Sequence, residues 1–97
     1  MAVTILLETQ AKPGGGDELL AMFKAALPDT RAWEGCIGLK AYRDQDNPDS
    51  IILVEDFETK EAYQKYLSWR QETGVFDQLS AMLAAPPSIR YLDLTDA

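Results

Sequence analysis

Four side chains that can do chemistry gather in one stretch of the sequence: Tyr63, Tyr66, Trp69 and Arg70. Their spacing of three and four residues places them on one broad face of a helix. Phenol groups donate and accept protons, arginine stabilises a developing phenolate or enolate, and tryptophan offers a flat surface to a planar ligand. The alternative interpretation is that the rings simply pack on a sheet and that Arg70 lies in a salt bridge.

A second candidate is Glu55, an acid that interrupts an apolar strand and is followed directly by Asp56. Strand alternation places these two acids on opposite faces, so one of them must share a face with apolar neighbours. A partly buried carboxylate has a raised pKa and can act as a base. The residues favour a structural salt bridge instead, to Arg43 or Lys40 on the neighbouring strand or across a dimer, since buried acids are normally paired.

Other residues carry weaker signals. Trp33 follows the first predicted helix and can either close one end of a pocket or plug the core, and Phe76 is an apolar candidate for ligand contact in the last predicted helix. Cys36 has no basic neighbour in sequence to activate it, so it is interpreted as a small hydrophobic residue. The glycine run 14–16 lacks both the spacing of a dinucleotide fingerprint and the lysine of a P-loop.

The composition excludes several classes of site. Histidine is absent from the 97 residues and Cys36 is the single cysteine, so catalytic triads built on imidazole are impossible and a zinc or iron site would need carboxylates alone. We therefore expect no metal and no cofactor. The net charge of −7, with nine basic residues scattered among sixteen acids, disfavours nucleic acid and anionic membrane surfaces as partners.

The same composition indicates where the protein works. A lone cysteine cannot form an internal disulfide, which fits a reducing cytoplasm. No apolar run approaches the length of a membrane span, and the N-terminal residues lack the basic start and cleavage pattern of a signal peptide. We expect a cytoplasmic protein that does not enter the membrane.

Apolar periodicity and turn residues predict the elements that position these side chains. Strands are predicted at 3–12, 36–44, 50–57 and 89–94, and helices at 17–27, 60–72 and 75–84, with a short helical segment at 29–33. Asp17 and Thr59 are the expected N-caps. Pro28 is expected to break or restart the first helix, and the turn at 46–49 makes the two middle strands an antiparallel hairpin.

The element order is strand, helix, strand, strand, helix, strand, which is typical of the ferredoxin-like arrangement. Residues 1–97 are therefore predicted to form one α+β domain with a four-stranded antiparallel sheet and its helices on one face. A bare apolar sheet face on so small a domain predicts self-association through that face.

Several segments together resemble the antibiotic biosynthesis monooxygenase domain. They are Trp33-Glu34-Gly35-Cys36, Tyr42-Arg43-Asp44, Asp46-Asn47-Pro48, and the run from Val54 to Tyr63 that reads VEDFETKEAY. The family pattern has an acidic residue and Gly-Cys before the second strand, a charged turn with Asp and Pro, Glu-x-aromatic at the end of the third strand, and Glu-Ala-aromatic entering the helix. The resemblance spans essentially the whole chain. It implies a dimeric α+β barrel, a homodimer joined through the sheets with a pocket in each subunit.

The resemblance also implies an activity. Known members oxidise polyphenols and anthrones to quinones with molecular oxygen and no metal or flavin, and others degrade haem or isomerise small signalling molecules. Many members carry a histidine after the Glu-Ala-aromatic segment, where this sequence has Tyr66. The haem-degrading branch uses a histidine ligand, which this sequence lacks, and has an asparagine in the first strand, where the stretch 6–8 offers none. Haem degradation is therefore set aside.

The resulting hypothesis is a cofactor-independent monooxygenase acting on a phenolic, quinol or anthrone-like aromatic. Tyr66 would hold or relay the proton, Arg70 would stabilise the enolate, and Glu55 is the reserve base. The expected substrate-binding residues are Trp33, Tyr63, Trp69 and Phe76. Two alternatives stay open: a dimeric ligand-binding or accessory module without turnover, and an isomerase or cyclase on the same scaffold.

Overall fold

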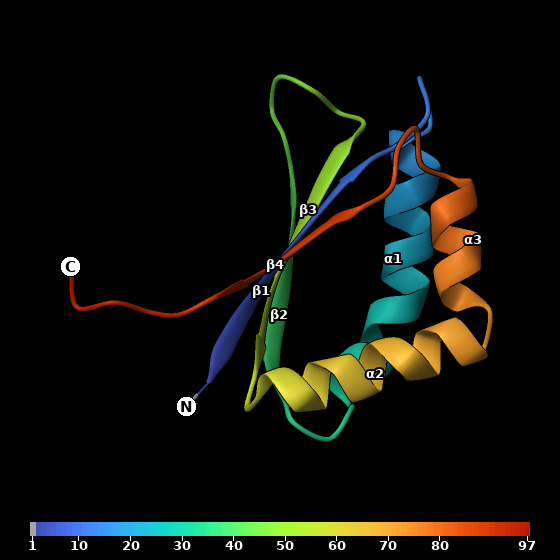
Figure 1. The fold of residues 1–97 in the computed structure, drawn as a ribbon. Helices are drawn as coiled ribbons and strands as arrows, with labels where there is room; N and C mark the ends of the chain where they lie inside the picture. The colour runs from blue at the N-terminus through green and yellow to red at the C-terminus, as the bar shows by residue number, and fades with distance from the viewer. Residues whose placement is uncertain (1) are drawn as a thin grey trace.

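A computed structural model describes residues 2–97, and their centre is a four-stranded antiparallel sheet. The strands are β1 (Val3–Gln10), β2 (Cys36–Arg43), β3 (Ser50–Phe57) and β4 (Ser88–Leu92), in the order β2-β3-β1-β4. The helices are α1 (Gly16–Arg31), α2 (Lys60–Glu72) and α3 (Val75–Ala81). All three lie on one side of the sheet, which is seen nearly edge-on in Figure 1. The predicted α+β class and ferredoxin-like order are confirmed.

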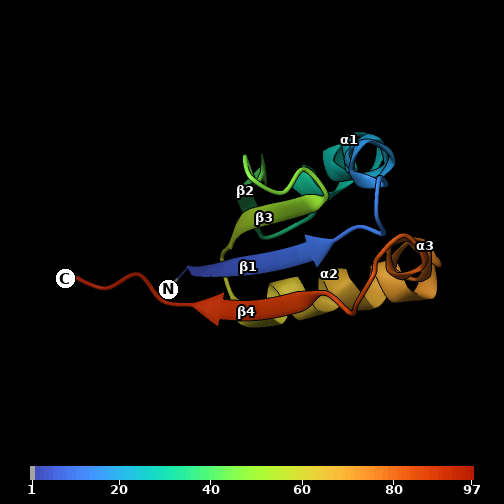
Figure 2. The ribbon, with the colours of Figure 1, turned by 90° about the horizontal axis from the view of Figure 1, so that it is seen from above.

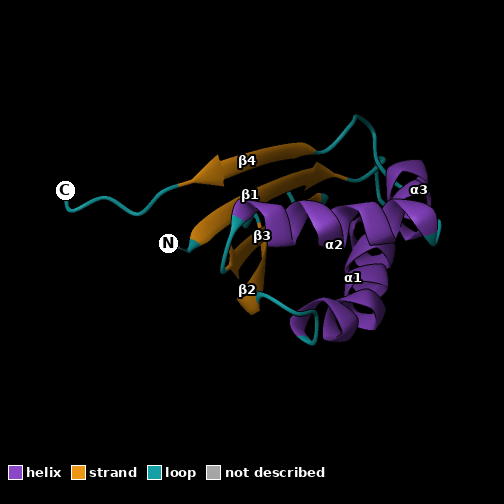
Figure 3. Cartoon of the chain, turned by 60° about the horizontal axis from the view of Figure 1, so that its bottom comes forward, coloured by secondary structure: helices purple, strands orange, loops and turns teal. Residues whose placement is uncertain are grey.

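The sheet separates a packed face from an open one. β1 and β3 alternate strictly between buried and half-buried residues, because only one of their faces is covered by helices. Viewed from above, α1 lies toward β2 and β3, whereas α2 and α3 lie toward β1 and β4 (Figure 2). Turning the molecule brings α2 in front of the sheet, with α1 below α2 and α3 at its right-hand end (Figure 3).

The first helix differs from its prediction at both ends. Pro28 does not break it, and α1 runs on to Arg31. A proline removes one N–H from a helix, and here the lost bond falls near the C-terminal end, where Ala32 N–H still donates to the Pro28 carbonyl at 3.1 Å. Asp17 is not the N-cap, because that position is Gly15, which has no capping side chain.

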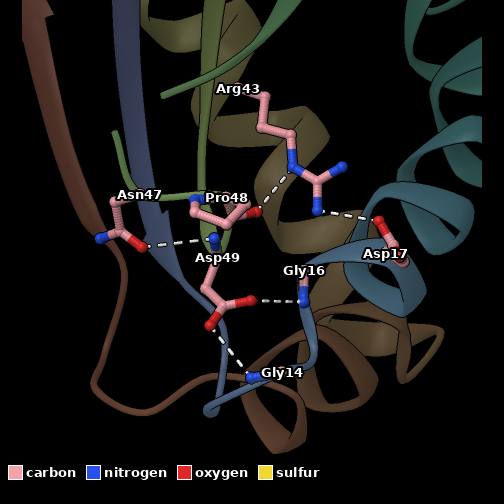
Figure 4. A network of polar contacts seen from close by, with 7 residues as sticks. All are labelled: Gly14, Gly16, Asp17, Arg43, Asn47, Pro48 and Asp49. Carbon is pink, nitrogen blue, oxygen red and sulfur yellow. Dashed lines mark hydrogen bonds and ion pairs between the residues drawn. The ribbon is translucent and has the colours of Figure 1, made fainter. Parts of the chain in front are cut away.

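The cap of α1 comes instead from a distant loop. Asp49, in the turn between β2 and β3, accepts hydrogen bonds from the backbone N–H of Gly16 at 2.9 Å and of Gly14 at 3.0 Å (Figure 4). Arg43 adds a second link, since its Nε donates to the Pro48 carbonyl at 2.6 Å and its Nη2 pairs with Asp17 at 2.8 Å. The hairpin turn and the helix start are thus tied together.

Removing the Asp49 cap should make the protein measurably less stable. Asp49→Ala should lower the free energy of unfolding by about 1–2 kcal/mol, because two backbone donors at the helix start lose their acceptor. Urea unfolding followed by circular dichroism measures the change. Asp46→Ala is the matched control, since its side chain lies in the same turn and accepts no hydrogen bond from residues 2–97. Equal stability of the two variants would contradict the capping role.

The remaining element ends follow local chemistry. Thr59 caps α2 as predicted, its hydroxyl accepting from the Ala62 N–H at 3.1 Å. Gly74, with φ of 81°, joins α2 to α3 in the left-handed region that glycine favours. β4 ends at Leu92 rather than at 94, because Leu92 already pairs with Thr4, close to the start of β1. Within residues 2–97, no helix is long and apolar enough to cross a membrane.

Candidate functional site

An apolar cavity of about 50 Å³ lies between the sheet and the three helices. Its walls include Phe23 and Leu27 of α1, Phe76 and Leu79 of α3, and Leu7 and Leu53 of the sheet. Three polar side chains interrupt this lining: Glu55 of β3, and Tyr66 and Arg70 of α2. Polar side chains in an apolar cavity are uncommon, so these three define the candidate site.

Glu55 is buried and has no polar partner among residues 2–97. Its side chain is on the covered face of β3, it is 2% exposed, and no hydrogen bond or ion pair reaches it from residues 2–97. The salt bridge expected within the chain is wrong, because Arg43 pairs with Asp17 and Lys40 lies beside Val54 on the opposite face. Burial raises the pKa of the Glu55 carboxyl to about 7. Such a group can both take and release a proton near neutral pH.

Arg70 is also buried, at 7% exposure, and no carboxylate pairs with it among residues 2–97. Its Nε donates to the Tyr66 hydroxyl at 2.9 Å, and its Nη2 donates to the Ala26 carbonyl at 2.6 Å and to the Thr30 hydroxyl at 3.1 Å. Its guanidinium also lies 4.5 Å from the centre of the Trp69 ring. These contacts hold the cation without neutralising it.

Thr30 completes this network and was missed by sequence reasoning. Its hydroxyl lies 2.6 Å from the Tyr66 hydroxyl, and the residue is fully buried. Thr30 continues the apolar stripe of α1 formed by Leu19, Phe23 and Leu27 at a spacing of three or four residues. A polar residue in that stripe is the one signal in the sequence that could have identified it.

The structure separates the remaining candidates from the cavity. Trp33 and Trp69 stack on each other with ring centres 4.8 Å apart, and neither lines the cavity. Tyr63 packs in a second core cluster against Phe57 and Tyr91. Burial, followed by the nearby Glu55, raises the pKa of the Tyr63 hydroxyl far above its usual value, so it stays protonated. Of the three predicted catalytic residues and four predicted binding residues, the structure thus brings Tyr66, Arg70, Glu55 and Phe76 to one cavity.

Other kinds of site find little support in the described part of the chain. Residues 2–97 hold no group of three acidic, cysteine or histidine side chains that could bind a metal ion. Cys36 is half-buried, and burial raises the pKa of its thiol, which leaves it protonated and weakly nucleophilic.

Comparison with known proteins gives a consistent result. The family model described as antibiotic biosynthesis monooxygenase matches residues 2–71. Among solved structures, a conserved protein from Methanosarcina mazei Go1 is 22% identical with a TM-score of 0.84, covering 95% of this chain and 91% of its own. An antibiotic biosynthesis monooxygenase is 16% identical with a TM-score of 0.85, covering 96% and 98%. A protein of unknown function from Nitrosomonas europaea is 22% identical with a TM-score of 0.83, covering 99% and 91%. No curated protein matches this chain significantly.

Proposed function

The chain belongs to the antibiotic biosynthesis monooxygenase family, and from this premise we propose that it oxidises a small phenolic, quinol or anthrone-like aromatic with molecular oxygen and no cofactor. The observation that carries the proposal is an apolar cavity lined by both a carboxyl and a guanidinium that do not pair with each other. An acid and a cation joined as an ion pair would satisfy each other. Here both remain available to a substrate.

The reaction uses these groups in sequence. The Glu55 carboxylate takes a proton from an activated C–H or phenol group, and the resulting enolate oxygen accepts a hydrogen bond from Arg70. The enolate carbon passes an electron to oxygen, and the two radicals combine to form a C–O bond. Loss of water then leaves a carbonyl, so a CH₂ group and O₂ become C=O and H₂O. The substrate supplies all the electrons, and no outside reductant is needed.

The geometry favours different roles from those expected for Tyr66 and Glu55. The Tyr66 hydroxyl is held between Arg70 and Thr30, whereas Glu55 has no hydrogen-bond partner among residues 2–97 and a pKa near 7. We therefore assign the base to Glu55 and give Tyr66 the task of orienting Arg70. The Trp69 ring lies against the Arg70 guanidinium, and Trp33 stacks on Trp69.

The cavity must widen before a ring system can enter. Ligand pockets commonly have volumes of roughly 300–1,000 Å³, whereas this cavity of about 50 Å³ holds only a few water-sized molecules. Phe76 and Leu79 form the wall that α3 contributes. Because α3 has only seven residues and follows Gly74, we propose that it moves outward when substrate binds.

Oxygen uptake tests the proposed function directly. The protein is mixed with a panel of hydroquinones and anthrones in metal-free buffer, and quinone formation is followed by absorbance. With an anthrone and ¹⁸O₂, one labelled atom should appear in the quinone as the new carbonyl oxygen and the other in water. No uptake above the uncatalysed rate across the panel would overturn the proposal. Product without oxygen consumption would indicate an isomerase or cyclase, and a ligand bound tightly but recovered unchanged would indicate a binding module.

We also propose that the open face of the sheet joins two copies of the chain. The half-buried Leu6 and Val54 are paired across β1 and β3 on that face, and Tyr42 is 52% exposed on the same side of β2. This apolar patch has no helix over it, and a second copy of the chain would supply a cover of matching shape.

A charge on this face should separate the two copies. Val54→Lys is expected to shift the protein from dimer to monomer in sedimentation velocity, because two lysines would be buried against apolar side chains across the symmetric interface. Ala21→Lys, on the exposed surface of α1, is the control and should leave the dimer intact. A Val54→Lys protein that stays dimeric would place the interface elsewhere.

A further inference from the structure

We propose that Thr30 is a positioning residue, whose hydroxyl holds Arg70 and Tyr66 in the one arrangement that leaves Arg70 Nη1 free for a substrate oxygen. The inference rests on the proposed function of the cavity, and it adds a residue outside the predicted site. Thr30 acts through Arg70 and does not itself line the cavity.

The hydrogen bonds of Arg70 use one edge of its guanidinium. An arginine has five N–H donors in a rigid plane. Nε donates to Tyr66, and Nη2 donates to Ala26 and Thr30, whereas Nη1 has no partner among residues 2–97. Since the group is planar, fixing the edge formed by Nε and Nη2 also fixes the direction in which Nη1 points.

Thr30 is the residue that joins the two sides of this edge. Its oxygen lies 3.1 Å from Arg70 Nη2 and 2.6 Å from the Tyr66 hydroxyl, which in turn accepts from Arg70 Nε. The three side chains therefore form a closed ring of hydrogen bonds. With the hydroxyl of Thr30 removed, Arg70 keeps its bonds to Tyr66 and Ala26, but the Tyr66 hydroxyl loses its link to α1 and is no longer held in place.

The chemistry explains why an alcohol occupies this position. An acid beside Arg70 would hold it equally well, but its negative charge would cancel the positive charge that an enolate needs. Thr30 and Ala26 instead offer neutral oxygens near the C-terminal end of α1, where the helix dipole is negative. The cation is thus fixed and its charge is kept for the ligand.

Thr30→Val tests the proposal, since it replaces the hydroxyl with a methyl group of similar size. With hydroquinones and anthrones as probes, kcat should fall roughly 10- to 100-fold with KM little changed, because the enolate forms only after binding. Thr30→Ser keeps the hydroxyl and should retain kcat within about threefold. Thr9→Val is the matched control. Thr9 is also buried and hydrogen-bonded, but its partner is the Ile51 carbonyl and it does not line the cavity.

A second measurement does not depend on turnover. The Nε–H of Arg70, followed by ¹H–¹⁵N NMR, should exchange slowly with solvent in the unmodified protein, in Thr30→Ser and in Thr9→Val, and faster in Thr30→Val. If no probe is oxidised by the unmodified protein, the proposed function fails, and the exchange rate alone decides the positioning role. Unchanged exchange in Thr30→Val, or equal loss of kcat in Thr30→Val and Thr9→Val, would overturn it.

Discussion

Glu55→Gln is expected to lower the rate of oxygen consumption by roughly 10²- to 10⁴-fold, the usual contribution of a general base. Glutamine has nearly the same shape as glutamate but cannot take a proton, so the cavity keeps its form and loses its base. In the unmodified protein, activity should rise with pH through about 7, where Glu55 ionises. Oxygen uptake across this pH range measures both effects. A Glu55→Gln protein with unchanged kcat would show that another group removes the proton.

The same substitution is expected to stabilise the fold at alkaline pH. The pKa of Glu55 is raised from 4.5 to about 7 on folding, so between these values the folded protein holds a proton that the unfolded chain has released. Stability from this group is therefore present below about pH 4.5 and is lost as the pH rises toward 7. The loss is about 3 kcal/mol. Glu55→Gln has no carboxyl at this position and should not lose this stability. The difference in free energy of unfolding between the variant and the unmodified protein should therefore grow between about pH 4.5 and 7 and stay constant above that.

The pH dependence of the difference isolates Glu55 from the other acids. Urea unfolding of both proteins at several pH values gives the difference in free energy, and groups common to both cancel. Glu58→Gln, an exposed change on the same segment, should show no such growth with pH. A constant difference for Glu55→Gln would mean that its carboxyl is well solvated. Gain of stability with loss of activity is the expected signature of a buried base.

Much of the fold follows from patterns within short stretches of sequence. Runs of apolar and β-branched residues predict the strands, turn residues predict the hairpin, and the Thr59 hydroxyl marks the start of α2. The prediction that Pro28 breaks the first helix is wrong, because a proline destabilises a helix less near its end than in its middle. The cap of α1 could not be predicted, since Asp49 is supplied by a turn more than thirty residues away in sequence.

The site could be predicted only in part, because helical spacing shows which side chains share a face but not what that face meets. The apolar residues of α2 pack in one core cluster, where Tyr63 lies beside Phe57, whereas Arg70 reaches across to α1. Two of the three hydrogen-bond partners of Arg70, Ala26 and Thr30, lie at least forty residues earlier in the chain. Only their meeting in space distinguishes a held, unneutralised cation from an arginine in a salt bridge.

The glycine run before α1 has a role in packing that its sequence did not indicate. Gly16 has an ordinary negative φ, so backbone conformation does not require glycine there. Space does, because a Cβ atom would lie 2.3 Å from the Pro48 carbonyl oxygen and 2.8 Å from Arg43 Nη2. That carbonyl belongs to the backbone and is held by Arg43, so it cannot turn aside as a flexible side chain would (Figure 4).

Gly16→Ala is therefore expected to lower the free energy of unfolding by roughly 2–4 kcal/mol, although alanine is ordinarily the better helix former by up to about 1 kcal/mol. Gly38→Ala is the control, since a Cβ atom there meets nothing within 4 Å. It should change stability by no more than about 0.5 kcal/mol. Urea unfolding of both variants measures the difference. Equal stabilities would mean that the Pro48 turn moves to make room for the Cβ atom at little cost in free energy.

Combining Gly16→Ala with Asp49→Ala tests the mechanism of this loss. Asp49 caps α1 through the Gly16 N–H, and the displacement that a Cβ forces would already pull this bond apart. The double variant should therefore lose less free energy of unfolding than the sum of the two single losses, as expected for neighbours that share one contact. Additive losses would mean that the cap survives the displacement. In that case the stability lost by adding the Cβ atom comes only from the displaced backbone of the Pro48 turn.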